Sequence, residues 1–138
     1  MIGILIITHG TLGESLIHCA SHVLNKRPPR LKQLGVTAQD DPTLLLPQSR
    51  TLAKELDDGS GVLILSDMYG GTPSNLASKL VVPGKIEAVA GVSLPMLIRV
   101  LTYRDRDLQT IVTKAISGGC EGVLRVPVFK LHNAATGS

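Results

Sequence analysis

The N-terminal segment of the chain contains the pattern that most restricts its fold. Residues 2–7, Ile-Gly-Ile-Leu-Ile-Ile, form a continuous apolar run rich in β-branched side chains. A strand with one face in water alternates apolar and polar residues, whereas a strand covered on both faces has no need to alternate. We therefore predict that this run is a strand buried on both faces and that it opens a central sheet.

Strand-like and helix-like segments alternate along the rest of the chain. The further predicted strands span residues 31–36, 61–65, 86–92 and 123–129, and the predicted helices span residues 12–24, 41–56, 74–81, 95–103 and 107–117, the last ended by Gly118-Gly119. Right-handed crossover connections return each strand to the same sheet. The pattern predicts an α/β fold with a doubly wound, mainly parallel central sheet and helices on both faces.

The length and composition predict one domain in the cytoplasm. The chain has 138 residues, of which 43% are hydrophobic, enough for one core between a sheet and its helices. We expect residues 1–130 to form this domain and residues 131–138, which include His132, to form a polar, mobile tail. No window approaches the roughly 20 apolar residues of a membrane span, and the N-terminal run lacks the charged region and cleavage site of a secretion signal.

Charge and cysteine content add little toward a function. The net charge of +3 would permit nucleic-acid binding, but the chain has only three aromatic residues, Tyr69, Tyr103 and Phe129, and no nucleic-acid-binding motif. We therefore expect no nucleic-acid partner. Cys19 and Cys120 stand in helix-like apolar surroundings without C-x-x-C spacing, which predicts buried, reduced thiols.

Two loops that follow predicted strands carry the candidate chemistry. Thr8-His9-Gly10 follows the first strand, and a loop that begins with Asp67 follows the third. Ligands gather at the carboxyl ends of the strands in such a sheet, and the first and third strands are neighbours in the common doubly wound orders. If Asp67 accepts the Nδ1 proton of His9, the Nε2 lone pair is free to attack. The strand position alone favours a structural histidine bonded to a loop backbone over a catalytic one.

The second loop has the composition of a phosphate-binding turn. Gly70-Gly71 lets the backbone approach a ligand, Thr72 suits a helix N-cap, and Pro73 suits the first helical turn. An ordinary tight turn into a helix explains the same residues. Neither a Walker A loop nor a G-x-G-x-x-G fingerprint is present, which argues against nucleotide hydrolysis and dinucleotide binding. His18 and His22 lack the glutamate of an HExxH motif, so no metal site is expected.

These residues together resemble the enzyme IIA component of the mannose family of the bacterial phosphotransferase system. The likeness comprises Thr8-His9-Gly10, the loop Asp67-Met68-Tyr69-Gly70-Gly71-Thr72-Pro73-Ser74-Asn75, and residues 90–97, and it covers the chain to about Pro127. The resemblance implies that His9 is phosphorylated on Nε2 by the carrier protein HPr and donates to a IIB component, without cofactor, bound metal or nucleotide.

The same resemblance assigns further roles. It implies that Asp67 orients His9, that Gly71 and Thr72 hold the phosphoryl oxygens, and that Met68 and Tyr69 form a rim where a partner docks. It also implies a homodimer that exchanges a C-terminal antiparallel strand, here residues 123–129. Contact with the membrane would then be indirect, through a transporter complex.

Two departures from the family pattern leave alternatives open. Many relatives have serine where this chain has Thr72, which keeps the hydroxyl and adds a methyl group. The sequence has no Ala/Pro-rich linker or fused IIB domain after Phe129, so we expect the IIB acceptor on a separate chain. The alternatives are a regulatory IIA whose phosphorylation state signals to a target, a subunit of a dihydroxyacetone phosphorelay, and a non-catalytic ligand-binding module in which His9 is structural.

Overall fold

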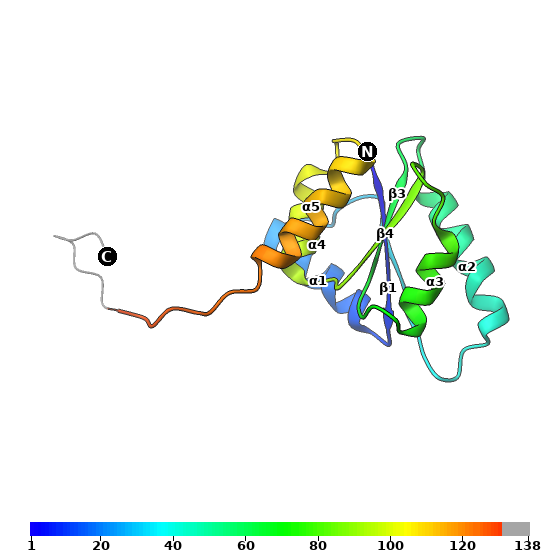
Figure 1. Ribbon diagram of the computed structural model, residues 1–138, viewed down its shortest axis with the longest axis horizontal. Coiled ribbons are helices and arrows are strands. Elements are labelled where there is room, and N and C mark those ends of the chain that lie inside the picture. The colour runs from blue at the N-terminus through cyan, green and yellow to red at the C-terminus, as the bar shows by residue number, and fades with distance from the viewer. Residues whose placement is uncertain (131–138) are drawn as a thin grey trace.

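The computed structural model describes residues 1–130 and contains one parallel sheet between two layers of helices (Figure 1). The strands lie in the order β2-β1-β3-β4, and all three neighbouring pairs are parallel. The elements are β1 (Gly3–His9), α1 (Leu12–Leu24), β2 (Leu31–Val36), α2 (Pro42–Leu56), β3 (Val62–Ser66), α3 (Thr72–Leu80), β4 (Ile86–Ala90), α4 (Leu94–Tyr103) and α5 (Leu108–Glu121). The predicted α/β fold is confirmed.

The central position of β1 follows from its apolar composition. Ile4 and Ile6 pack with residues of α1, α4 and α5 on one face, and Leu5 and Ile7 pack with residues of α2 and α3 on the other. All four side chains are fully buried. Because β1 lies between β2 and β3 and is covered on both faces, only a strand without polar side chains in its middle fits there.

Side-chain caps fix the starts of three helices, one of them α4, where Ser93 Oγ accepts a hydrogen bond from the Met96 N–H at 3.3 Å. Asp41 accepts a hydrogen bond from the Thr43 N–H at 2.9 Å, with Pro42 as the first residue of α2. Asp107 accepts one from the Thr110 N–H at 2.7 Å at the start of α5. Each carboxylate satisfies a backbone N–H that has no partner inside the helix.

The prediction that Gly118-Gly119 ends the last helix is wrong, because α5 continues to Glu121. The two glycines allow α4 and α5 to approach closely. A Cβ atom at Gly118 would lie 2.9 Å from the Arg99 Cβ, and one at Gly119 would lie 2.9 Å from the Met96 Cε. These glycines are therefore required by helix packing rather than by a turn.

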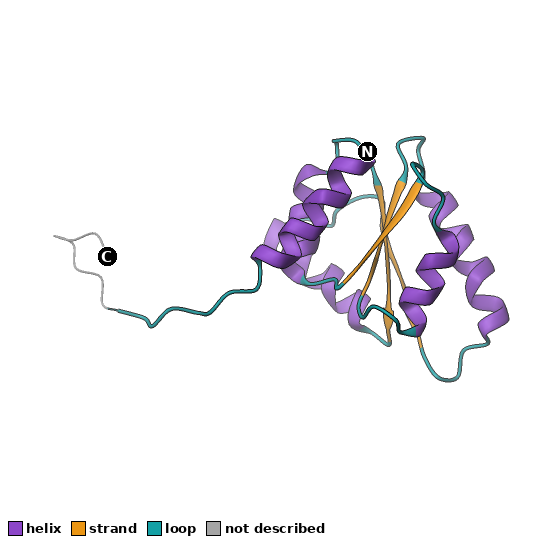
Figure 2. Cartoon of the chain, in the orientation of Figure 1, coloured by secondary structure: helices purple, strands orange, loops and turns teal. Residues whose placement is uncertain are grey.

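The predicted strand at residues 123–129 is not formed within this chain. Residues 123–130 have no regular secondary structure and extend away from the domain (Figure 2). The side chains of Val123, Leu124, Val126, Val128 and Phe129 are 70–87% exposed. The predicted strand exchange in a dimer stays a prediction, and the predicted tail at 131–138 lies outside the described residues.

Two further observations concern the surface. Cys19 and Cys120 are both exposed, so the prediction of buried thiols is wrong, because each cysteine lies on the solvent side of its helix. Across residues 1–130, no helix combines the length and the apolar character needed to cross a membrane.

Arg104 joins several chain segments at the end of the sheet where the strands begin. Its buried guanidinium donates hydrogen bonds to the carbonyl oxygens of Ile2, Pro29 and Arg30. The Arg104 carbonyl in turn accepts from the Ile2 N–H at 3.1 Å. A single side chain thereby ties the end of α4 to the starts of β1 and β2.

Candidate functional site

His9 and Asp67 are brought together because β1 and β3 are paired. The register sets Ile7 opposite Ser66, so the two strands end at the same edge of the sheet. His9 is the last residue of β1, and Asp67 directly follows β3. The predicted adjacency of the two loops is confirmed, and it depends on the strand order rather than on nearness in sequence.

The carboxylate of Asp67 holds His9 by two contacts. The His9 Nδ1 lies 2.8 Å from Asp67 Oδ2, and the His9 backbone N–H donates to the same oxygen at 2.9 Å. The Met68 N–H donates to Asp67 Oδ1 at 2.8 Å. With an ionised carboxylate, Nδ1 carries the proton, so that the Nε2 lone pair of the neutral ring is free. The His9 side chain is 52% exposed and accessible to a partner, whereas that of Asp67 is 13% exposed.

The surroundings of Asp67 favour its ionised form. Partial burial opposes ionisation, but the hydrogen bonds from His9 and from the Met68 N–H outweigh it and lower the pKa of the Asp67 carboxyl. A carboxyl whose pKa is lower in the folded than in the unfolded chain contributes stability above its unfolded pKa of about 4. That contribution is lost as the pH falls through the folded value.

The loop after β3 brings backbone close to the imidazole. Gly70 has a φ of +88°, a conformation that glycine adopts without strain. Gly71 lies against His9, because a Cβ atom at Gly71 would be 3.1 Å from the His9 Cε1 and 3.7 Å from the Nε2. Any side chain at residue 71 would therefore press on the imidazole edge that includes the free nitrogen.

Thr72 does not cap α3, contrary to the prediction. Gly71 is the N-cap residue, Thr72 is the first residue of the helix, and no side chain caps this helix. A helix N-terminus leaves backbone N–H groups without partners and has a positive dipole end. Because the N-cap Gly71 contacts His9, an anion bonded to Nε2 would lie near this helix end.

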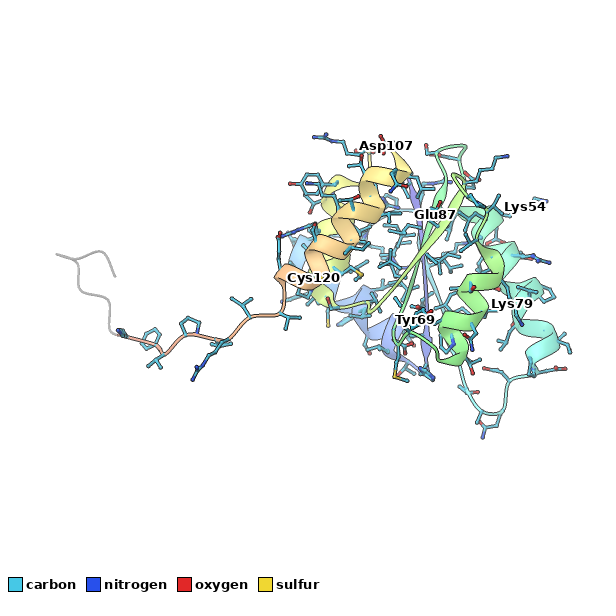
Figure 3. The ribbon with its side chains drawn as sticks, in the orientation of Figure 1. Lys54, Tyr69, Lys79, Glu87, Asp107 and Cys120 are labelled. Atoms are coloured by element: carbon cyan, nitrogen blue, oxygen red, sulfur yellow. The ribbon has the colours of Figure 1, made fainter. Side chains whose placement is uncertain are left out.

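Two apolar side chains lie exposed in the loop that Asp67 begins. Met68 is 62% exposed and Tyr69 is 88% exposed. Figure 3 labels Tyr69 near the start of α3, well away from Lys54 at the opposite edge of the sheet. Large apolar side chains at this level of exposure fit a surface that a partner covers.

Thr8 is a supporting residue to which sequence reasoning assigned no role. Its buried Oγ1 accepts a hydrogen bond from the Gly13 N–H at 2.9 Å, which fixes the start of α1 beside β1. A Cβ atom at Gly13 would lie 3.2 Å from this oxygen. The available signal was the polar Thr8 at the end of an otherwise apolar strand.

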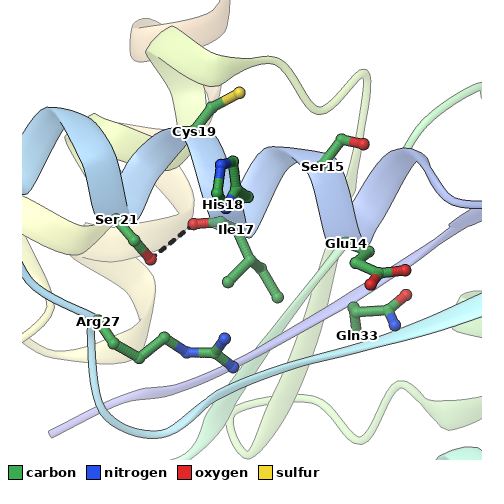
Figure 4. A pocket seen from close by; sticks show the side chains of 8 residues that line it. All are labelled: Glu14, Ser15, Ile17, His18, Cys19, Ser21, Arg27 and Gln33. Carbon is green, nitrogen blue, oxygen red and sulfur yellow. Dashed lines mark hydrogen bonds between the residues drawn. The ribbon is translucent and has the colours of Figure 1, made fainter.

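A separate cleft of about 890 Å³ lies along α1 and does not include the His9 site (Figure 4). His18 and Cys19 are among its lining residues, and Ser21 donates to the Ile17 carbonyl at 2.7 Å. In the described part of the chain, no three His, Cys, Asp or Glu side chains gather in a way that could hold a metal ion. The cleft therefore gives His18 no ligand partners.

Comparisons with known proteins agree with this arrangement. The family described as "PTS system fructose IIA component" matches residues 3–116. The mannose-specific EIIAB component of Escherichia coli K12 is 36% identical over 141 residues, covering 97% of this chain and 42% of that protein. The chain thus spans less than half the length of this relative.

Solved structures share the fold. The mannose/sorbose-specific IIA subunit from Enterococcus faecalis superposes with a TM-score of 0.83 at 20% identity, covering 94% of this chain and 98% of that one. The EIIA component from Streptococcus agalactiae gives a TM-score of 0.80 at 23% identity, covering 91% and 97%. From the matched residues and the identity to the Escherichia coli protein, the chain belongs to the mannose-type family of IIA components of the phosphotransferase system.

Proposed function

We propose that this chain is a phosphoryl carrier of the sugar phosphotransferase system, in which His9 accepts a phosphoryl group from phospho-HPr and passes it to a IIB component. The observation that carries the proposal is the 2.8 Å contact between His9 Nδ1 and Asp67 Oδ2 on a half-exposed imidazole. A structural histidine would direct its second nitrogen to the protein. Here the contact leaves Nε2 at the surface beside a helix N-terminus.

The transfer exchanges one N–P bond for another. The Nε2 lone pair of His9 attacks the phosphorus of the donor phosphohistidine, and the donor N–P bond breaks as the new one forms. The Nδ1 proton stays on His9, so the ring gains positive character, which the Asp67 carboxylate stabilises. Transfer to the IIB component reverses these roles, with Nε2 of His9 as the leaving group.

The phosphoryl oxygens face the start of α3 in this proposal. The Gly71 N–H already donates to the Met68 carbonyl at 3.2 Å and would have to exchange this partner for a phosphoryl oxygen. The Thr72 backbone N–H lies near the helix end, and the Thr72 hydroxyl can donate a further hydrogen bond. Fixed donors of this kind stabilise the charge on the three equatorial oxygens of the transferring group. Met68 and Tyr69, exposed in the same loop, form the apolar rim on which HPr docks.

We also propose that two copies of the chain form a dimer by exchanging residues 123–129. Five apolar side chains in this segment are exposed, and such a concentration of apolar surface is unfavourable in water. Among the described residues, β4 pairs with β3 on one side and with Val82 at Ile86 on the other, so the rest of that second edge is open to a further strand. The exchange would bury the exposed segment and cover that edge.

A labelling experiment tests the carrier function. The purified chain is incubated with phosphoenolpyruvate, enzyme I and HPr, and the phosphate bound per chain is measured. We expect one acid-labile phosphate per chain, its appearance to require HPr, and its loss when a mannose-type IIB protein is added. Failure to label the chain while HPr itself is fully phosphorylated would rule the proposal out.

Asp67→Asn is expected to slow labelling by a factor on the order of a hundred or more. The amide is neutral and can present an N–H rather than an acceptor to Nδ1, so the tautomer with a free Nε2 is no longer favoured. The initial rate of labelling by phospho-HPr measures the effect. Glu14→Gln, which neutralises an exposed carboxylate in the first turn of α1, is the control and should label at the normal rate. Equal rates for both variants would show that Asp67 does not orient His9.

A further inference from the structure

The open edge of β4 offers only a short stretch for pairing. The Val62 N–H donates to the Lys85 carbonyl, so residues 85, 87 and 89 direct their backbone groups toward β3 and residues 86, 88 and 90 direct theirs outward. Val82 already exchanges both hydrogen bonds with Ile86, at 2.8 and 2.9 Å. Ala88 and Ala90 are therefore the residues whose outward groups can receive an added strand.

The two faces beside this edge differ in chemistry. On the α3 side, a hollow of about 200 Å³ is lined by hydroxyl groups and small side chains, among them Ser66, Tyr69, Ser74, Ser78, Ala88 and Ala90. Its lining also includes Ala77 and Val81, so that four of the eight lining residues carry a hydroxyl group and the rest are apolar. The hollow lies next to the loop that Asp67 begins.

On the opposite face, α5 presents an apolar side beyond β4. The side of α5 that contacts α4 is marked by Lys114, whose Nζ lies 4.3 Å from the Tyr103 ring centre, and by Ser117, which bonds to Arg99. Val112 and Ile116 lie on the side of the helix away from these contacts, at helical spacing. Ile116 is 52% exposed, so this apolar side is open in the single chain.

The C-terminal segment has two faces of matching character. Alternate side chains of an extended strand point to opposite faces. One face of this segment therefore carries Leu124, Val126 and Val128, and the other carries Arg125 with residues 123, 127 and 129. The first face is purely aliphatic and matches the Val112 and Ile116 side of α5. The second face carries Val123, Arg125, Pro127 and Phe129, of which only Arg125 is charged, and the hollow offers hydroxyl groups to this one charged side chain.

We propose that the hollow beside Tyr69 receives Arg125 of a second copy, with Arg125 opposite Ala88. This proposal rests on the strand exchange of the proposed function and assigns its register. Residues directly opposite in an antiparallel pair share a face, and Ala88 lines the hollow. The same register sets Val123 opposite Ala90 and brings Pro127 to the position next to Ile86 that Val82 already fills.

Pro127 supports this register. Proline has no N–H and cannot complete a hydrogen-bonded pair, so it cannot lie opposite Ala88 or Ala90. Ile86 needs no further partner because Val82 already occupies its outward groups. Pairing therefore ends before Pro127, because Val82 lies opposite Ile86 and the added strand has to leave the edge there.

The register would add a positive charge at the carboxyl ends of the strands, where His9 lies. The four segments that follow the strands, residues 10–14, 37–46, 67–76 and 91–97, contain no lysine or arginine but include Glu14, Asp40, Asp41 and Asp67. Arg125 of the second copy would thus place a guanidinium beside the loop of Asp67. Each site of the dimer would then be completed by the other copy.

Disulfide trapping between copies tests the register. In full-length chains carrying Cys19→Ser and Cys120→Ser, one chain with Ala88→Cys is refolded with another carrying Arg125→Cys and oxidised. The two Cα atoms of such a pair lie about 5.5 Å apart, within the range of a disulfide. We expect a covalent dimer from the mixture and none from either chain alone.

Val126→Cys is the matched control, since a one-residue slip would set residue 126 opposite Ala88. A disulfide between Ala88→Cys and Val126→Cys, with none between Ala88→Cys and Arg125→Cys, would overturn the register. A dimer in which neither pair of cysteines forms a disulfide would also overturn it. Sedimentation of the wild-type chain separates this outcome from failure of the exchange itself. A monomer would refute the exchanged dimer, whereas a dimer without the expected cross-link would refute only the position of Arg125.

Discussion

His9→Gln is expected to reduce labelling by phospho-HPr to the background of the assay while the chain stays folded. The variant has no nitrogen that can form the N–P bond, so no amount of donor restores the reaction. The side chain is half exposed at the end of β1, and the backbone N–H of residue 9 still donates to Asp67. We expect the free energy of unfolding to change by no more than about 1 kcal/mol, the typical contribution of one hydrogen bond.

His18→Gln is the matched control for this experiment. His18 lies exposed on α1, in the cleft that does not include the His9 site, and its replacement should leave labelling unchanged (Figure 4). Circular dichroism and a denaturant titration establish that both variants are folded. Persistent labelling of the folded His9→Gln chain would mean that another residue receives the phosphate.

Arg104→Met is expected to cost the largest amount of stability among the substitutions considered. The guanidinium is buried and donates to the carbonyls of Ile2, Pro29 and Arg30. Methionine keeps much of the side-chain volume but takes the guanidinium donor away from the Ile2 and Pro29 carbonyls, while the Arg30 carbonyl still accepts from the Ile4 N–H at 3.0 Å. Loss of a hydrogen bond from a charged group to a buried acceptor costs several kcal/mol, so we expect the free energy of unfolding to fall by roughly 3 kcal/mol.

The effect of Arg104 is measured by urea unfolding, with Arg106→Met as the comparison. Arg106 is a neighbouring arginine with an exposed side chain, and substitutions of exposed residues usually change stability by less than about 0.5 kcal/mol. The midpoint should fall for Arg104→Met and stay nearly constant for Arg106→Met. Equal midpoints would show that the buried guanidinium does not hold the start of the sheet.

The sequence predicts the parts of this fold that depend on local patterns. The unbroken apolar run of β1 indicates burial on both faces, and Asp41-Pro42 marks the start of α2 where the structure has it. The contact between His9 and Asp67 follows from the general strand order of doubly wound sheets, and the register confirms it. These features depend on residues that have one common structural use.

The wrong predictions concern residues whose use depends on distant neighbours. Gly118 has the composition of a helix stop, but its missing side chain is needed for contact with Arg99 of α4. Thr72 suits a cap, yet Gly71 is the N-cap residue, and its missing side chain leaves room for the His9 ring. The segment 123–129 has a strand pattern but no strand partner among the described residues, and its exchange with a second copy stays a prediction.

The site of phosphorylation tests the central claim most directly. The chain, labelled with nitrogen-15 in its histidines, is phosphorylated with phosphoenolpyruvate, enzyme I and HPr, and coupling between phosphorus and the ring nitrogens is recorded by NMR. We predict one phosphorylated histidine, His9, with phosphorus bonded to Nε2 and the proton retained on Nδ1 beside Asp67. Phosphorus on Nδ1 of His9, on another histidine, or on no histidine would contradict the account.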